Sequence, residues 1–90
     1  MNNGLYRQIF VWRRKNENEA IRYACLESVT TGLFYVQSAD FFRLPIDGEQ
    51  ARLHDSQFVE LFIEDSIADR ANGHATLARA IAQHDSDFSN

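Results

Sequence analysis

Three segments in the first half of the chain are rich in β-branched and aromatic residues and free of internal proline. Such segments are typical of β-strands, whose side chains point alternately to the two faces of a sheet. The pattern predicts strands at about residues 5–15, 19–29 and 33–44. The polar breaks between them suit hairpin turns, so we expect a three-stranded antiparallel meander. Ser38-Ala39-Asp40 interrupts the third strand and marks a bulge or a bend.

After Pro45 the hydrophobic period becomes helical. Pro45 ends the third strand because it supplies no backbone donor. Apolar residues then recur every three or four positions, as in amphipathic helices. We expect helices at about 47–69 and 73–84, followed by a polar tail at 85–90.

Short polar residues suggest where these helices begin. Asp47 is a candidate N-cap with Gln50 three residues later, as in a capping box. Asp55 lies on the apolar side of the first helix, so a break there is possible. Asn72 is the candidate cap of the last helix. The predicted fold is therefore α+β: a three-stranded antiparallel meander followed by two or three α-helices packed on one face of the sheet.

Composition favours one folded unit. The 90 residues are 44% hydrophobic and 24% charged, which is ordinary for a globular protein, and we expect a single domain at 1–90. The single cysteine, Cys25, excludes a disulfide within the chain and lies in an apolar strand, where a thiol is usually buried. With no secretory leader and no apolar run of membrane-spanning length, we expect a cytoplasmic protein.

Charge is distributed unevenly along the chain. Residues 1–46 hold six Lys/Arg and four Asp/Glu, whereas residues 47–90 hold three and nine. The net charge of −4 disfavours binding to nucleic acid and to anionic membranes. It suits a basic protein partner, which would contact acidic residues of the helical half. The candidate contacts are Glu60, Glu64, Asp65 and Asp69.

Both faces of the predicted sheet carry large apolar side chains. A sheet with helices on one face normally shows a clean alternation of apolar and polar residues instead. Strict alternation places Tyr6, Phe10 and Trp12 on one face of the first strand. It also places Tyr35 and Phe41 together on one face of the third strand. Because the helices are expected to cover one face only, these five residues form a predicted interface.

Motifs for catalysis or metal binding are weak. His-Asp-Ser occurs at 54–56 and 84–86, but consecutive helical residues do not face one another, so neither tripeptide is a catalytic triad. His74 and His84 would be about 15 Å apart on a helix, too far to share one metal ion. The four scattered glycines match no phosphate-binding loop. The sequence predicts no enzyme, no cofactor and no metal.

Three functional hypotheses follow. The first is a small non-catalytic protein-interaction or regulatory module that forms a homodimer through its aromatic sheet face. The second is a small-molecule or RNA-binding sheet that stacks ligands on Tyr6, Phe10, Trp12 and Tyr35. The third is an acidic inhibitor or immunity-type protein for a basic partner.

Overall fold

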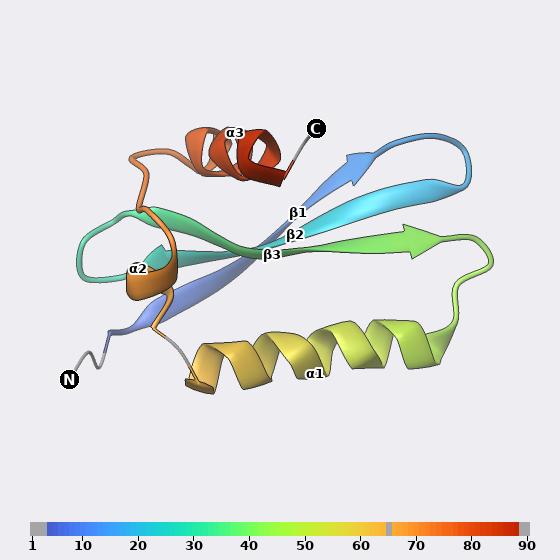
Figure 1. The fold of residues 1–90 in the computed structure, drawn as a ribbon, viewed down its shortest axis with the longest axis horizontal. Coiled ribbons are helices and arrows are strands. Elements are labelled where there is room, and N and C mark those ends of the chain that lie inside the picture. The colour runs from blue at the N-terminus through green and yellow to red at the C-terminus, as the bar shows by residue number, and fades with distance from the viewer. Residues whose placement is uncertain (1–3, 65, 89–90) are drawn as a thin grey trace.

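The computed structural model describes residues 4–64 and 66–88, apart from the side chains of Asp69 and Arg70. Its elements, in chain order, are β1 (Tyr6–Arg14), β2 (Glu19–Ser28), β3 (Phe34–Arg43), α1 (Gly48–Glu64), α2 (Ile67–Arg70) and α3 (Leu77–Phe88). The strands form one antiparallel sheet in the order β1-β2-β3 (Figure 1). The α+β class and the three-stranded antiparallel meander are confirmed.

Short polar turns close both hairpins. Between β1 and β2, Asn16 Oδ1 accepts a hydrogen bond from the Asn18 N–H at 2.8 Å. Between β2 and β3, Gly32 adopts φ +75°, a left-handed conformation that glycine reaches without steric cost. Its N–H donates to the Ser28 carbonyl at 2.8 Å, which fixes the end of β2.

The helices cover opposite faces of the sheet, so the expectation that they pack on one face is only partly met. α1 lies on one side of the sheet and α3 on the other (Figure 1), and Ile67 of α2 packs with Leu26 and Tyr35 on the α1 side. The chain changes side beside β3, where the N–H of Phe34 donates to the His74 carbonyl at 2.8 Å and the N–H of His74 donates back at 2.9 Å. After this bridge at the sheet edge the chain continues on the second face. There the apolar side of α3, which includes Ala80 and Ile81, is buried against the sheet.

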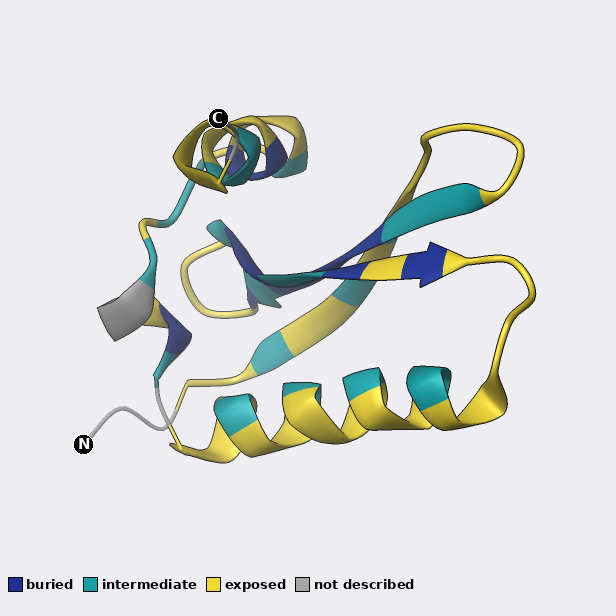
Figure 2. Ribbon diagram, turned by 45° about the vertical axis from the view of Figure 1, so that its right-hand side comes forward, coloured by how far each residue is buried: buried dark blue, intermediate teal, exposed yellow. Residues whose placement is uncertain are grey.

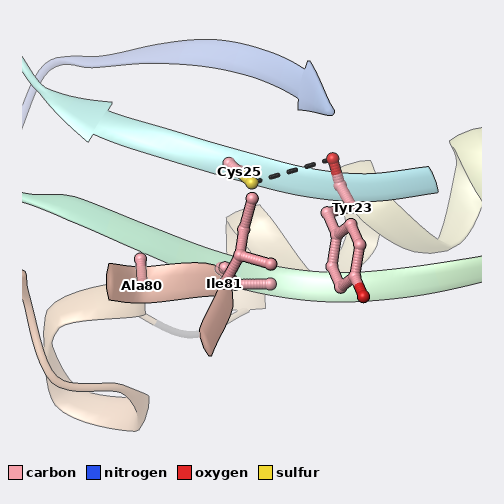
Figure 3. Close-up of a cluster of buried hydrophobic side chains, with 5 residues drawn as sticks. Tyr23, Cys25, Ala80 and Ile81 are labelled. Carbon is pink, nitrogen blue, oxygen red and sulfur yellow. Dashed lines mark hydrogen bonds between the residues drawn. The ribbon is translucent and has the colours of Figure 1, made fainter. Parts of the chain in front are cut away.

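Two apolar clusters form the core, one on each face. On the α3 side, Tyr23, Cys25 and Val36 pack against Ala80 and Ile81; Figure 3 shows Ile81 pointing toward the Cys25 sulfur. The second cluster contains Leu26 from β2, Tyr35 from β3 and Ile67 from α2, with Tyr6 and Phe58 packed against it. The apolar residues on both faces of the central strand are therefore explained by helices on both sides.

A β-bulge lies in β3 at Gln37, one residue before the interruption predicted at Ser38-Ala39-Asp40, and it corrects the predicted side-chain faces. Ala24 pairs with Ser38, but the next residue, Cys25, pairs with Val36, so Gln37 is an extra residue in β3. An extra residue reverses the alternation beyond it. Tyr35, opposite Leu26, therefore faces α1, whereas Phe41, opposite Ile21, faces the α3 side. The prediction that Tyr35 and Phe41 share a face is wrong.

α1 begins as expected but ends earlier. Asp47 Oδ1 accepts a hydrogen bond from the Glu49 N–H at 2.9 Å, as an N-cap does. Gln50 does not complete a capping box; its side-chain amide donates to the Phe41 carbonyl at 3.2 Å. The helix continues through Asp55 without a break and ends at Glu64, so α2 is a separate helical turn.

α3 begins and ends later than the sequence predicts. Its N-cap is Thr76, whose Oγ1 accepts a hydrogen bond from the Arg79 N–H at 3.2 Å, so Asn72 does not cap it. The helix continues to Phe88, and residues 85–88, expected in the polar tail, are helical. The last two residues of that predicted tail lie outside the described part of the chain.

Burial is concentrated in the sheet interior. Figure 2 shows the buried residues mainly on β2, β3 and one side of α3. No residue of β1 or α1 is buried. The first strand and the first helix are therefore the elements with the most uncovered apolar surface.

Candidate interaction surface on the outer strand

No described residue pairs with the outer backbone edge of β1. Two hydrogen bonds bracket its pairing with β2: Lys15 N–H to the Glu19 carbonyl at 3.0 Å, and Val29 N–H to the Leu5 carbonyl at 2.9 Å. Antiparallel pairing alternates, so the odd-numbered residues between Leu5 and Lys15 bond to β2. The even-numbered residues direct their N–H and C=O groups away from the sheet. They are Tyr6, Gln8, Phe10, Trp12 and Arg14.

Two large aromatic side chains stand on these outward-bonding residues. Phe10 is 41% exposed and Trp12 is 57% exposed, and both lie on the sheet face that α1 partly covers. α1 packs mainly against β3, so it leaves the outer strand open. We call the free backbone of residues 6–14, together with the Phe10 and Trp12 side chains, the edge surface.

Arg22 of β2 makes cation–π contacts with the aromatic rings of the edge surface. The Arg22 guanidinium lies 4.5 Å from the Phe10 ring centroid and 5.1 Å from that of Phe42. It lies 5.8 Å from the ring of Trp12. Contacts of this kind are attractive and gain strength where water is excluded. The aromatic rings of Phe10, Trp12 and Phe42 therefore all contact the same guanidinium group.

Carboxylates hold that guanidinium in place. Arg22 Nη2 lies 2.9 Å from Asp40 Oδ2, and both side chains are about nine-tenths buried. The same Nη2 lies 3.0 Å from Asp55 Oδ1 on α1. His54 Nδ1 lies 3.4 Å from Asp40 Oδ1. The network ties β2, β3 and α1 together beneath the edge surface.

The edge surface continues into an apolar groove at the β1–β2 hairpin end. The groove has a volume of about 450 Å³. Trp12 and Phe42 line it together with Leu44, Ile46 and Ala51. Leu44 and Ile46 are both more than half exposed. The exposed apolar area therefore reaches from β1 to the segment that precedes α1.

The five aromatic residues predicted as an interface are separated. Only Phe10 and Trp12 lie together on the edge surface. Tyr35 is buried, and Tyr6 packs between it and Phe62 of α1, with ring centroids 6.3 Å and 5.9 Å away. Phe41 is exposed on the other face of the sheet, with Lys15 Nζ 5.9 Å from its ring.

Sequence reasoning missed Arg22 and Phe42. The available signal for Arg22 was a lone cation between Ile21 and Tyr23 in an otherwise apolar strand, a position that requires a buried partner. The partner, Asp40, could not be assigned to the same face because the bulge at Gln37 changes the alternation. For the same reason, alternation did not place Phe42 on the face of Arg22.

The predicted acidic surface is partly described. Glu60 and Glu64 are both exposed, and they lie one turn apart on α1. Asp65 lies outside the described residues, as does the side chain of Asp69.

Cys25 and the acidic and histidine side chains were the candidate nucleophile and metal ligands. Cys25 is fully buried, and burial raises the pKa of its thiol to about 11, so it is a poor nucleophile at neutral pH. Residues 4–64 and 66–88 contain no group of three or more His, Cys, Asp or Glu that could hold a metal ion. None of the helices described here is both long and apolar enough to cross a membrane.

Comparison with known proteins gives no relative: no protein-family model, no curated protein and no solved structure matches the chain.

Proposed function

We propose that this protein is a small non-catalytic interaction module that forms a homodimer by antiparallel pairing of β1 with β1 of a second copy. The observation that carries the proposal is the edge surface: a nine-residue outer strand whose outward-bonding residues include the exposed Phe10 and Trp12. Addition of a strand to an open sheet edge supplies main-chain hydrogen bonds, and the neighbouring side chains supply specificity.

Natural edge strands are commonly blocked by proline, by a bulge, by charged side chains or by a covering segment. Among the residues that the structure describes, β1 has only the charged side chains, which are its three arginines. β1 contains no proline or glycine, and its pairing with β2 has no register shift. A second copy can therefore approach along the whole strand.

The arginines of β1 repel those of a second copy less strongly than the sequence of the strand suggests. Of its three arginines, Arg7 lies 3.6 Å from Glu27 and Arg13 lies 2.9 Å from Asp85. These ion pairs reduce the positive charge that each copy presents to the other. Tryptophan at the centre of an interface commonly contributes much of the binding energy, so Trp12 is the expected anchor.

A proline substitution tests the strand pairing. In Gln8→Pro the lost N–H is one that points away from β2, so the β1–β2 ladder keeps its hydrogen bonds while addition of a strand is blocked. Gln8→Val is the matched control because it keeps the N–H. Light scattering across a concentration series should give a dimer for the wild-type protein and Gln8→Val, and a monomer for Gln8→Pro.

Trp12 provides an independent signal. It is the only tryptophan, so fluorescence excited at a wavelength that tyrosine does not absorb reports on the edge surface alone. Its emission should shift to shorter wavelength as the dimer forms, because association removes the ring from water. A wild-type protein that stays monomeric at the highest concentration would overturn the proposal. So would a Gln8→Pro variant that dimerises as well as the wild type.

A further inference from the structure

A cavity of about 320 Å³ lies on the opposite side of β3 from the edge surface, between the bulge, α2 and α3. Its volume is at the small end of the range for ligand pockets. Apolar residues such as Val36, Ile67 and Ala80 line part of it, and Gln37, His84 and Asp87 supply polar groups. This mixture of apolar walls and a few polar groups is typical of a site for a small molecule.

Gln37 offers a buried hydrogen-bond acceptor at this cavity. The residue is only 7% exposed, and its Nε2 donates to the Phe58 carbonyl at 2.9 Å. That bond fixes the orientation of the amide, so the atom without a hydrogen-bond partner among the described residues is the carbonyl oxygen Oε1. A buried carbonyl left unpaired is destabilising. Because Oε1 has almost no accessible surface, a ligand N–H can complete its hydrogen bonding only after a small shift of the Gln37 side chain.

His84 supplies a second polar atom of this kind. Its Nδ1 is buried and has no partner among the described residues. Burial lowers the pKa of the ring, so His84 is neutral at pH 7 and does not repel a cation. The Phe88 ring lies beside it, with centroids 4.6 Å apart, and both rings line the cavity. Aromatic walls of this kind favour a cation or a flat group.

Among the described side chains, the charge at the cavity is negative. Asp87 lines it, and Gln83 Nε2 holds the Asp87 carboxylate at 2.8 Å. The last turn of α3 contains no basic residue, and the carboxyl end of a helix carries a partial negative charge. The described lining residues include no lysine or arginine. A positively charged ligand therefore fits this cavity better than an anion.

We infer that the cavity binds a small organic cation with N–H donors, such as an amine or a guanidinium on a short carbon chain. The positive charge of the ligand lies near Asp87, its carbon chain packs against Phe88, and a small shift of the Gln37 side chain brings Oε1 within reach of a ligand N–H. This inference does not depend on the homodimer, because the cavity and the edge surface share no lining residue.

Calorimetric titration of the full chain tests the inference. Agmatine and butylamine are the probes, with butanol and butyrate as a neutral and an anionic analogue of similar size. Both cations should bind, agmatine more tightly because its guanidinium offers more donors. Butanol and butyrate should bind at least about tenfold more weakly.

Two variants locate the site. Asp87→Asn removes the charge at the cavity and should weaken agmatine binding about threefold, because the Asp87 side chain is exposed and solvent screens its charge. Glu64→Gln is its matched control, because it removes an exposed carboxylate on α1 that does not line the cavity. Ala68→Leu fills the cavity from an exposed position and should abolish binding without unfolding the chain, which circular dichroism would check. The inference is overturned if neither cation binds, if butanol binds as tightly, or if Asp87→Asn and Glu64→Gln behave alike.

Discussion

Arg22 of β2 and Asp40 of β3 form a buried ion pair in which Nη2 lies 2.9 Å and Nε 3.2 Å from Asp40 Oδ2. Asp40→Asn leaves the guanidinium charge buried without its closest counter-charge. Removal of one partner from a buried pair costs more than the pair contributes, because the other charge stays desolvated. We expect the free energy of unfolding, measured with urea, to fall by about 3 kcal/mol.

The second carboxylate of the network is the control for that change. Asp55 also contacts Arg22, but its side chain is 62% exposed, so solvent screens the interaction. Asp55→Asn should lower the free energy of unfolding by less than about 1 kcal/mol. Equal losses for the two variants would show that burial does not determine the strength of these contacts.

Alanine substitutions at Gly48 and Gly73 should change the stability of the protein in opposite directions. At Gly48, the first residue of α1, an added Cβ meets no atom within 4 Å, so Gly48→Ala should stabilise the protein by about 0.4–1 kcal/mol. At Gly73 the same atom would lie 2.9 Å from Leu33 Cδ1 and 3.0 Å from Tyr35 Cζ. Gly73→Ala should therefore cost about 1–3 kcal/mol. Thermal unfolding of both variants checks the signs; a stabilising Gly73→Ala would contradict the close packing of this segment on β3.

The thiol of Cys25 should be protected in the folded protein. It is fully buried in the cluster that includes Ile81, and its raised pKa leaves little thiolate at neutral pH (Figure 3). A thiol reagent such as Ellman's reagent should react slowly with the native protein and rapidly in denaturant. Ile81→Ala removes a covering side chain and should speed the native reaction, whereas Ile63→Ala, at a position 76% exposed, should not. Rapid reaction of the native wild-type protein would contradict the burial of Cys25.

The meander was predictable because its determinants are local. Asn16 and Gly32 form turns between segments whose composition favours strands, and few other arrangements suit links so short. The paths of the helices depend on contacts distant in sequence. The bridge between Phe34 and His74 takes the chain to the second face, and no local pattern marks it. Because the sequence gives no sign of this bridge, it predicted that the helices cover only one face of the sheet.

The candidate site was only partly predictable for the same reason. Alternation along an unbroken strand correctly placed Phe10 beside Trp12, because β1 has no bulge. In β3 a single extra residue, Gln37, reverses the alternation, so Phe42 and Asp40 join Arg22 beneath the edge surface and Phe41 faces the other side. The Gln37 amide at the bulge donates to the Phe58 carbonyl of α1, a contact between residues distant in sequence that alternation along the strand does not reveal.

His84 should make the protein less stable in mild acid. Burial lowers the pKa of its ring below the ordinary value of 6.5, and this effect outweighs Asp85 and Asp87, which act in the opposite direction. Tyr23 of β2 and Phe88 of α3 pack against the ring, and neither offers a negative charge at neutral pH. As the pH falls below about 6.5, the unfolded chain therefore takes up a proton before the folded chain does.

In that pH range the unfolded state binds more protons, so the free energy of unfolding decreases as the pH decreases. The decrease begins near the unfolded pKa and ends below the folded one, where both states carry the proton. His84→Gln removes this contribution and leaves every carboxylate in place. Urea unfolding at pH 7.5 and pH 5 should therefore show a smaller acid-induced loss for His84→Gln than for the wild-type protein. An equal loss in both would mean that the ring is solvated well enough to be protonated in the folded state, which would contradict its burial between α3 and the sheet.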